Sequence, residues 1–220
     1  MSLLDRLGPR KDEIEAPRVV TSADAPVFPT KALRKFLSCL GSRESPALLD
    51  LGPVIGSNVA FFGEQLGCKI HIEDLFADLD RHLRQDDLAS FPAFLTSRFA
   101  GQAGPVDGIL CWDLLDYLDR ASAAALAEQL TRLLRPEGAL LGFFGATPSH
   151  DARYTKYVIV DPAQLKYRGY PAVRGRQPVL PNRDIIRLFS TLRVSDSFLL
   201  QNNIREILFR KPAWEGREIQ

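Results

Sequence analysis

A glycine-bearing turn between an apolar run and a helical pattern constrains the fold of this chain more than any other feature. Three apolar residues lead into the stretch Asp50–Asn58, Asp-Leu-Gly-Pro-Val-Ile-Gly-Ser-Asn, and a helical pattern follows from Val59 to Leu66. This order predicts a strand, a tight turn and a helix. Such a turn aims free backbone N–H groups and the positive end of a helix dipole at one point, where an anionic group of a ligand can bind. Its two glycines, Gly52 and Gly56, allow positive φ and the close approach of a ligand to the backbone.

Apolar runs and helical patterns alternate along the rest of the chain. Strands are expected at about 47–51, 69–74, 106–112 and 139–144, and helices at 31–40, 75–83, 91–99, 122–134 and 182–192. Residues 194–210 predict a terminal hairpin. The alternation favours an α/β fold, a three-layer sandwich with a Rossmann-like, mostly parallel sheet, to which the hairpin adds an antiparallel strand. No clear strand can be placed in residues 84–105.

The length of 220 residues fits one domain. We expect residues 1–28 to form a flexible or docking arm, 29–212 the folded domain, and 213–220 a tail. Within the domain, residues 146–180 contain four of the five tyrosines, six Lys or Arg residues and four prolines. This composition predicts a lid or substrate insertion of loops and short strands that could grip a phosphate, a carboxylate or an aromatic acceptor. The alternative is an irregular surface whose tyrosines pack on the sheet.

The composition is that of an ordinary globular protein, with 45% hydrophobic and 25% charged residues. A net charge of +1 creates no overall field that favours nucleic acid or an anionic membrane. The sequence shows neither an apolar run of membrane-span length nor the apolar core of a signal peptide. Three isolated cysteines lack metal-ligand spacing and fit a reducing compartment, so we expect a cytoplasmic protein without a metal.

Polar residues follow three of the predicted strands. The glycine turn ends the first, Glu73 and Asp74 end the second, and Trp112 and Asp113 end the strand at 106–112. In an open parallel sheet, ligands bind beyond the carboxyl ends of the strands. An acid 23 residues after Asp50 suits a carboxylate that accepts hydrogen bonds from a ribose diol, with Glu73 the first choice and Asp74 the second. The alternative is that both acids cap the next helix.

Several of these stretches together resemble the class I S-adenosylmethionine-dependent methyltransferases. Asp50-Leu51-Gly52 with Gly56 is similar to the first motif of that family. Residues 106–118 resemble its fourth strand and exit, residues 133–141 (Leu-Leu-Arg-Pro-Glu-Gly-Ala-Leu-Leu) its turn before the fifth strand, and the terminal hairpin its last two strands. The resemblance covers roughly residues 30–211.

This resemblance implies methyl transfer from S-adenosylmethionine to a small or medium acceptor. It places the cofactor's methionine part on the turn, its ribose on an acid of the second strand, and its sulfonium near the fourth strand. The cofactor-binding candidates are Asp50, Gly52, Pro53, Gly56, Asn58, Glu73, Asp74, Cys111 and Trp112. The family also has an acid near the adenine at the end of a third strand, for which Asp86 and Asp87 are available.

The candidates for catalysis are Asp113, Tyr117 and His150. His150 follows the fifth predicted strand and could act as a general base, although a single histidine in such a loop is more often a surface residue. Asp113 and Tyr117 could orient an acceptor, and Asp113 could equally cap the segment that follows it.

The turn also departs from the family pattern. The family commonly has glycine at the position of Val54 and a small residue at Ile55, whereas β-branched side chains restrict the backbone and add bulk. Pro53 removes an N–H donor and fixes φ. An alternative function is therefore a non-catalytic, methyltransferase-like binding or scaffold protein with a degenerate cofactor site and a partner protein in place of an acceptor. A third possibility, a nicotinamide-dependent oxidoreductase, is disfavoured by the terminal hairpin and the altered turn.

Overall fold

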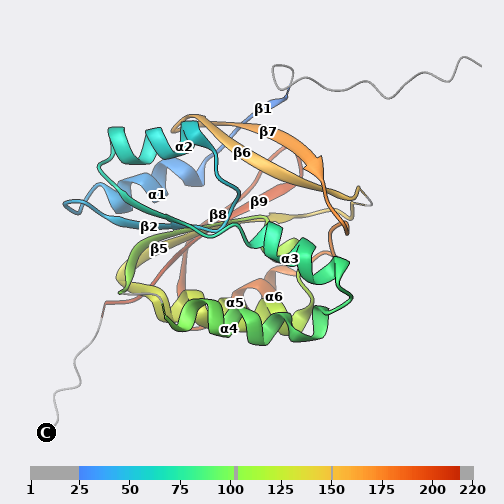
Figure 1. Ribbon diagram of the computed structural model, residues 1–220. Helices are drawn as coiled ribbons and strands as arrows, with labels where there is room; N and C mark the ends of the chain where they lie inside the picture. The colour runs from blue at the N-terminus through green and yellow to red at the C-terminus, as the bar shows by residue number, and fades with distance from the viewer. Residues whose placement is uncertain (1–24, 102–103, 150, 214–220) are drawn as a thin grey trace, which may run out of the picture.

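The computed structural model describes residues 25–101, 104–149 and 151–213 (Figure 1). The strands are β1 (Val27–Pro29), β2 (Ala47–Asp50), β3 (Lys69–Ile72), β4 (Val106–Trp112), β5 (Leu134–Gly145), β6 (Arg153–Asp161), β7 (Gln164–Pro171), β8 (Arg193–Leu199) and β9 (Ile204–Arg210). The α-helices are α1 (Ala32–Leu40), α2 (Gly56–Ala60), α3 (Leu75–Arg84), α4 (Phe91–Ala100), α5 (Arg120–Leu133) and α6 (Asn182–Leu188). Most of the expected arm, 1–28, and most of the expected tail, 213–220, lie outside the described residues. The strand β1, Val27–Pro29, includes the last two residues of the expected arm.

The main sheet has six strands in the order β3-β2-β4-β5-β9-β8. The pairs β2–β3, β2–β4 and β4–β5 are parallel, and β9 is antiparallel to both of its neighbours. Asp50 at the end of β2 lies opposite Ile72 of β3 and Leu110 of β4. The carboxyl ends of these three strands therefore meet at one edge of the sheet, which confirms the predicted α/β fold and the antiparallel strand of its terminal hairpin.

Side chains alternate between two hydrophobic cores, one on each face of the sheet. In β2, Leu48 packs into the core that contains α1, whereas Leu49 packs into the core of α3, α4, α5 and α6. In β4, Leu110 and Ile109 divide in the same way. Figure 1 shows α1 and α2 on one side of the sheet and α4, α5 and α6 on the other. This three-layer arrangement follows from apolar strands whose successive side chains point to opposite faces.

A second, three-stranded antiparallel sheet, β1-β7-β6, takes the place of the predicted lid of loops and short strands. Its long hairpin, β6–β7, crosses from one core to the other: Tyr157 belongs to the core of α1, and Tyr154 to the core of α3 and α5. Both tyrosines are buried. A strand that joins the two cores must pass over the edge of the main sheet, and Tyr154 and Tyr157 pack against it as the alternative interpretation of this segment expected.

Among the described residues between α3 and β4, none belongs to a strand of the main sheet. The described part of residues 85–105 contains a short 3-10 turn (Leu88–Ser90) and α4, so the chain reaches β4 without adding a strand beyond β3. Asp87 accepts a hydrogen bond from the Ser90 hydroxyl at 2.6 Å, and Asp86 has a φ of 53° in the connecting turn. Neither acid lies at the end of a strand, and a contact of either one with an adenine stays a prediction.

Three element boundaries differ from those expected. The helix after the glycine turn has only five residues and continues as a π-helical turn, Phe61–Gln65. The chain passes directly from α5 into β5, so Pro136 lies within a strand and not in a loop that breaks the helix. The helix expected at 182–192 begins at Asn182, after Pro181 as its N-terminal cap, but ends at Leu188. None of these differences changes which residues meet at the edge of the sheet.

The two ends of the described chain are joined through Glu206 of β9. This side chain is fully buried, and its Oε2 accepts hydrogen bonds from the backbone N–H groups of Lys31 and Ala32, each at 2.8 Å. The first N–H groups of a helix have no partner within the helix, and a carboxylate also interacts favourably with the dipole there. The hydroxyl of Thr30, just before α1, accepts a longer hydrogen bond from the Leu33 N–H at 3.4 Å.

Within the described residues, none of the helices is long and apolar enough to cross a membrane.

Candidate functional site

Asp50 lies at the centre of the edge where β2, β3 and β4 end. Its carboxylate is buried, and Oδ1 accepts hydrogen bonds from the Gly52 N–H at 2.9 Å and from the Trp112 indole N–H at 2.6 Å. Burial raises the pKa of Asp50 to about 6, the two hydrogen bonds oppose this shift, and the nearby charge of Asp74 adds to it. The site thus contains a buried carboxylate that is hydrogen-bonded to a tryptophan of the same chain.

The Trp112 side chain fills the space above Gly52. A Cβ atom placed on Gly52 would lie 2.8 Å from Trp112 Cδ1 and 2.9 Å from its Nε1. The indole also stacks on the Tyr157 ring of β6, with centroids 5.2 Å apart and planes 4° from parallel. Only 4% of Trp112 is exposed. The close approach that a glycine permits here is therefore used by an indole of the chain itself.

Trp112 adopts this position with a backbone φ of 48°. A bulky residue in the left-handed region is an outlier that costs about 1–3 kcal/mol and persists only where the surroundings fix it. The hydrogen bond to Asp50 and the stack on Tyr157 are such surroundings. This strain coincides with the point at which the fold places ligands.

The two glycines of the turn have different roles, and neither was predicted correctly as a source of positive φ. The described glycines with positive φ are Gly67 and Gly104. Gly52 is needed for the contact with Trp112, whereas a Cβ on Gly56 would meet nothing within 4 Å. Val54, the suspected obstacle, is 67% exposed. The crowding at this turn therefore comes from β4 rather than from the turn itself.

Asn58, a predicted cofactor contact, binds the backbone of β6. Its Nδ2 donates to the Tyr157 carbonyl at 2.8 Å, and its Oδ1 accepts from the Ile159 N–H at 2.9 Å. The side chain is buried, with 3% exposed. Two bonds from one amide to alternate residues of a strand hold that strand in a fixed position. Asn58 thus connects the glycine turn to the hairpin that covers it.

The two acids after β3 have different partners. Asp74 caps α3, since its Oδ1 accepts a hydrogen bond from the Ala77 N–H at 3.1 Å. Glu73 is not a cap: its Oε2 forms an ion pair with Arg98 of α4, with Nε at 2.8 Å and Nη2 at 2.5 Å. The contact of Glu73 with a ribose stays a prediction.

A buried charge cluster lies beyond the end of β4. Asp113 is fully buried and accepts a hydrogen bond from Arg176 Nη2 at 2.7 Å, while Arg176 Nε lies 3.7 Å from Asp116. Burial raises the pKa of Asp113, and the Arg176 charge opposes the shift. Burial also raises the pKa of Asp116 to about 7, against the effect of Arg176 and of the Gly145 N–H, which donates to Asp116 at 2.7 Å. Burial and the nearby Asp113 raise the pKa of Tyr117.

Among the residues predicted for catalysis, Asp113 and Tyr117 are thus brought together, since the Tyr117 hydroxyl lies 3.5 Å from Asp113 Oδ2. His150 lies outside the described residues. Cys111 packs into the core of α3 and α5, on the opposite face from Trp112, and burial raises the pKa of its thiol. The described residues contain no group of three or more His, Cys, Asp or Glu side chains that could hold a metal.

Sequence reasoning missed Arg176 and Tyr157 as individual members of the site. Both lie in the segment 146–180, which was predicted only as a unit. Arg176 supplies the countercharge of Asp113, and Tyr157 covers Trp112. Their type gave a signal, because a buried acid is often paired with a cation and aromatic side chains often pack against one another. The spacing gave none, since both residues are distant in the chain from the atoms they contact.

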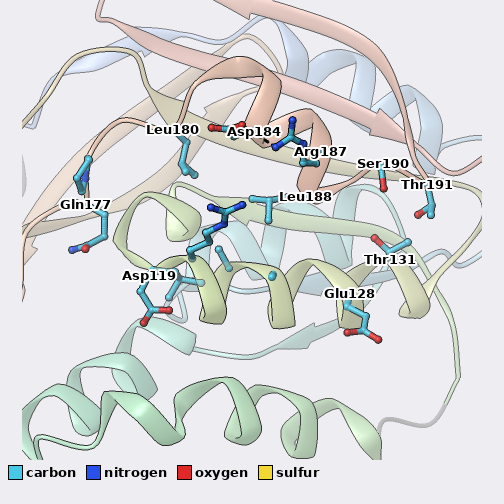
Figure 2. A pocket seen from close by; sticks show the side chains of 15 residues that line it. Asp119, Glu128, Thr131, Gln177, Leu180, Asp184, Arg187, Leu188, Ser190 and Thr191 are labelled. Carbon is cyan, nitrogen blue, oxygen red and sulfur yellow. Dashed lines mark ion pairs between the residues drawn. The ribbon is translucent and has the colours of Figure 1, made fainter.

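An open groove lies elsewhere, between α5 and α6 (Figure 2). It has a volume of about 710 Å³, within the range of small-molecule pockets. Apolar side chains of both helices and of the preceding loop line it together with charged residues at its rim; they include Leu118, Leu180, Leu188, Glu128 and Arg187. Sequence analysis did not predict this groove.

Searches against known proteins yielded structural matches alone: no protein-family model matches the chain, and no curated protein sequence is significantly similar to it. An S-adenosylmethionine-dependent methyltransferase from Clostridium acetobutylicum superposes with a TM-score of 0.50 and 12% identity, covering 87% of this chain and 94% of that one. The glycopeptide N-methyltransferase MtfA gives 0.48 and 16%, covering 83% and 96%. The 1,6-didemethyltoxoflavin-N1-methyltransferase of Burkholderia thailandensis gives 0.47 and 15%, covering 82% and 78%. With the sheet order and the terminal hairpin described above, the Clostridium match shows that the chain has the fold of the class I S-adenosylmethionine-dependent methyltransferases.

Proposed function

We propose that the protein binds S-adenosylmethionine at the ends of β2, β3 and β4 and transfers its methyl group to a small or medium acceptor. The observation that supports this proposal is the convergence of Asp50, Glu73 and Asp113 at one edge of a sheet with the methyltransferase fold. Ligands of open parallel sheets bind at this edge. When bound, the cofactor would supply the methyl group.

The groups at this edge suit the cofactor in chemistry but not in space. The Glu73 side chain, which forms an ion pair with Arg98, has the acceptor oxygens to which a ribose diol donates hydrogen bonds. The backbone at Gly52, however, is covered by the Trp112 indole. In the conformation described here the cofactor does not fit against the turn, and binding requires the indole to move away from Gly52.

This filled space also favours a second candidate function. A methyltransferase-like scaffold would keep the fold and lose the cofactor, and an indole bound to Asp50 and stacked on Tyr157 is a stable filling for such a lost site. Its partner would be a protein rather than a small-molecule acceptor. The two candidates differ in one measurable property, the binding of the cofactor.

Isothermal titration calorimetry with S-adenosylhomocysteine tests the proposal. We expect the native protein to bind and Glu73→Ala to bind about 10- to 150-fold more weakly, the equivalent of losing hydrogen bonds to a charged group, about 1.5–3 kcal/mol. Glu64→Ala is the matched control, since Glu64 is an exposed acid on the π-helical turn and its removal changes the net charge equally. Absence of binding by both the native protein and Trp112→Ala would favour the scaffold. Equal binding by the native protein, Glu73→Ala and Glu64→Ala would show that Glu73 does not contact the ligand.

A further inference from the structure

We propose that Trp112 and Asn58 form a gate over the cofactor site: Trp112 fills it, and Asn58 latches the β6–β7 hairpin closed over Trp112. The ligand-dependent part of this inference rests on the proposed function. The gate itself is a property of the apo protein and can be tested without a ligand.

Trp112 occupies the site through contacts with three separate elements. It donates its indole N–H to Asp50 at the end of β2, it lies against Gly52 of the turn, and it stacks on Tyr157 of β6. A ligand that reaches the Gly52 backbone must displace the indole, and a ligand that binds the Asp50 carboxylate must replace its N–H. The indole is thus an internal competitor for the atoms that the ligand needs.

The Trp112 backbone favours release once these contacts are lost. Its φ of 48° lies in the left-handed region, which is unfavourable for a bulky side chain. Strain of this kind persists only while the surrounding structure fixes it. An open state relieves the strain, which offsets part of the interactions lost with Asp50 and Tyr157.

Asn58 supplies the connection between this filling and the hairpin. Its amide bonds to Tyr157 and Ile159 and so holds the segment of β6 that stacks on Trp112. Because Asn58 lies in α2, directly after the glycine turn, the latch joins the floor of the site to its cover. Loss of the latch would free β6 to move away and leave Trp112 without the ring on which it stacks.

A closed site lowers apparent affinity by the fraction of molecules that are open. A change that weakens the latch without touching the ligand should therefore tighten binding rather than weaken it. This direction distinguishes a latch from a ligand-binding residue, which Asn58 was predicted to be. A ligand contact made by Asn58 would give the opposite result when removed.

The first experiment measures the gate without a ligand. The chain has two tryptophans, so Trp214→Phe leaves Trp112 as the only tryptophan, whose emission can be excited selectively over that of the tyrosines. In that background, we expect Asn58→Ala to increase acrylamide quenching of Trp112 at least twofold, whereas Ser57→Ala, an exposed neighbour in the same helix, leaves it unchanged. Asn58→Asp, which keeps the acceptor for Ile159 but loses the donor to Tyr157, should give an intermediate value and serves if Asn58→Ala does not fold. Quenching of the folded Asn58 variants equal to that of Ser57→Ala would overturn the gate.

The second experiment adds S-adenosylhomocysteine to the same proteins. We expect Asn58→Ala to bind at least fivefold more tightly than the Ser57→Ala control, with a change in Trp112 emission that saturates with binding. Equal affinities with unchanged emission would overturn the gate and leave the proposed cofactor site intact. A quenching difference between the variants, without binding by any of them or by Trp112→Ala, would support the gate and overturn the proposed function.

Discussion

The edge of the sheet, where the fold is expected to leave space for a ligand, is filled with side chains, whereas the groove between α5 and α6 is open. At the edge, where this fold binds ligands, the side chains of Trp112 and Tyr157 are buried and stacked. Between α5 and α6, where the sequence analysis predicted no binding site, a groove of about 710 Å³ is open (Figure 2). The molecule thus has a filled site whose side chains make specific contacts, and an open groove that lacks such contacts.

The difference lies in how each region uses its charged residues. At the edge, Arg176 is largely buried and paired with the fully buried Asp113 at 2.7 Å. In the groove, Arg187 is exposed and lies 3.8 Å from Asp184, itself partly exposed. Removing one partner of a buried ion pair strongly destabilises the fold, whereas an exposed ion pair contributes little to folding stability. An open groove alone is therefore a weaker indication of function than a buried charged group that is paired with an opposite charge.

The two arginines test this comparison with the largest expected effect. We expect Arg176→Ala to lower the free energy of unfolding by about 3–5 kcal/mol, because it leaves Asp113 buried without a countercharge. Arg187→Ala should change it by less than about 0.5 kcal/mol. Urea denaturation of both variants at pH 7 measures the difference. Similar values for the two would contradict the distinction between a filled and an open region.

The pH dependence of stability sharpens the comparison at Asp50. Its pKa of about 6 is above the usual value of 3.8, so the folded protein takes up this proton at a higher pH than the unfolded chain does. The contribution of Asp50 therefore favours the fold at low pH and is lost as the pH rises through 6. Asp50→Asn lacks this contribution, so its stability relative to the native protein should be higher at pH 7 than at pH 4, by up to about 3 kcal/mol.

Thermal or urea unfolding of the native protein and Asp50→Asn at pH 4, 5, 6 and 7 measures this difference. The comparison cancels the effect of Asp116, whose pKa of about 7 acts in the same direction in both proteins. A constant difference across this range would show that Asp50 ionises as it would in water. The indole N–H would then contact a carboxylate open to solvent.

The two glycines of the turn give the smallest expected effect. Gly52→Ala would place a Cβ 2.8 Å from the Trp112 ring, so we expect a loss of about 1–3 kcal/mol as the indole shifts. Gly56→Ala meets nothing within 4 Å and should be neutral or slightly stabilising. Denaturation of both variants decides whether the indole fills this space in solution. A neutral Gly52→Ala would mean that Trp112 has already left the site.

Hydrophobic periodicity predicted most of the main sheet and its helices, because alternation and helical spacing are local properties of the sequence. The pattern around Leu48 and Leu49 is one example, since it places successive side chains in opposite cores. The hairpin β6–β7 was predicted only as short strands and loops. Its strands are held by contacts such as those of Asn58, a residue about 100 positions away, and such contacts leave no periodic signal.

The position of the candidate site was predicted from the sequence, but the side chain that fills it was not. Strand ends, acids and the glycine turn located the edge of the sheet correctly, because parallel strands bring their carboxyl ends together. Sequence alone drew attention to Val54, which points to solvent, and overlooked the filling of the same turn by Trp112. The side chain that occupies a turn can come from another strand, and only the packing of the strands shows which one.

The buried carboxylate of Glu206 has a consequence for the order of folding. It lies about 175 positions after the helix whose first N–H groups it satisfies, so α1 is synthesised early but receives its cap only when β9 is in place. Contacts of such long sequence separation carry a large loop-closure cost and slow the folding of a chain. While a nascent chain still lacks β9, α1 therefore lacks this carboxylate at its N-terminus and part of its apolar core stays exposed, so the last of the described strands completes the first of the described helices.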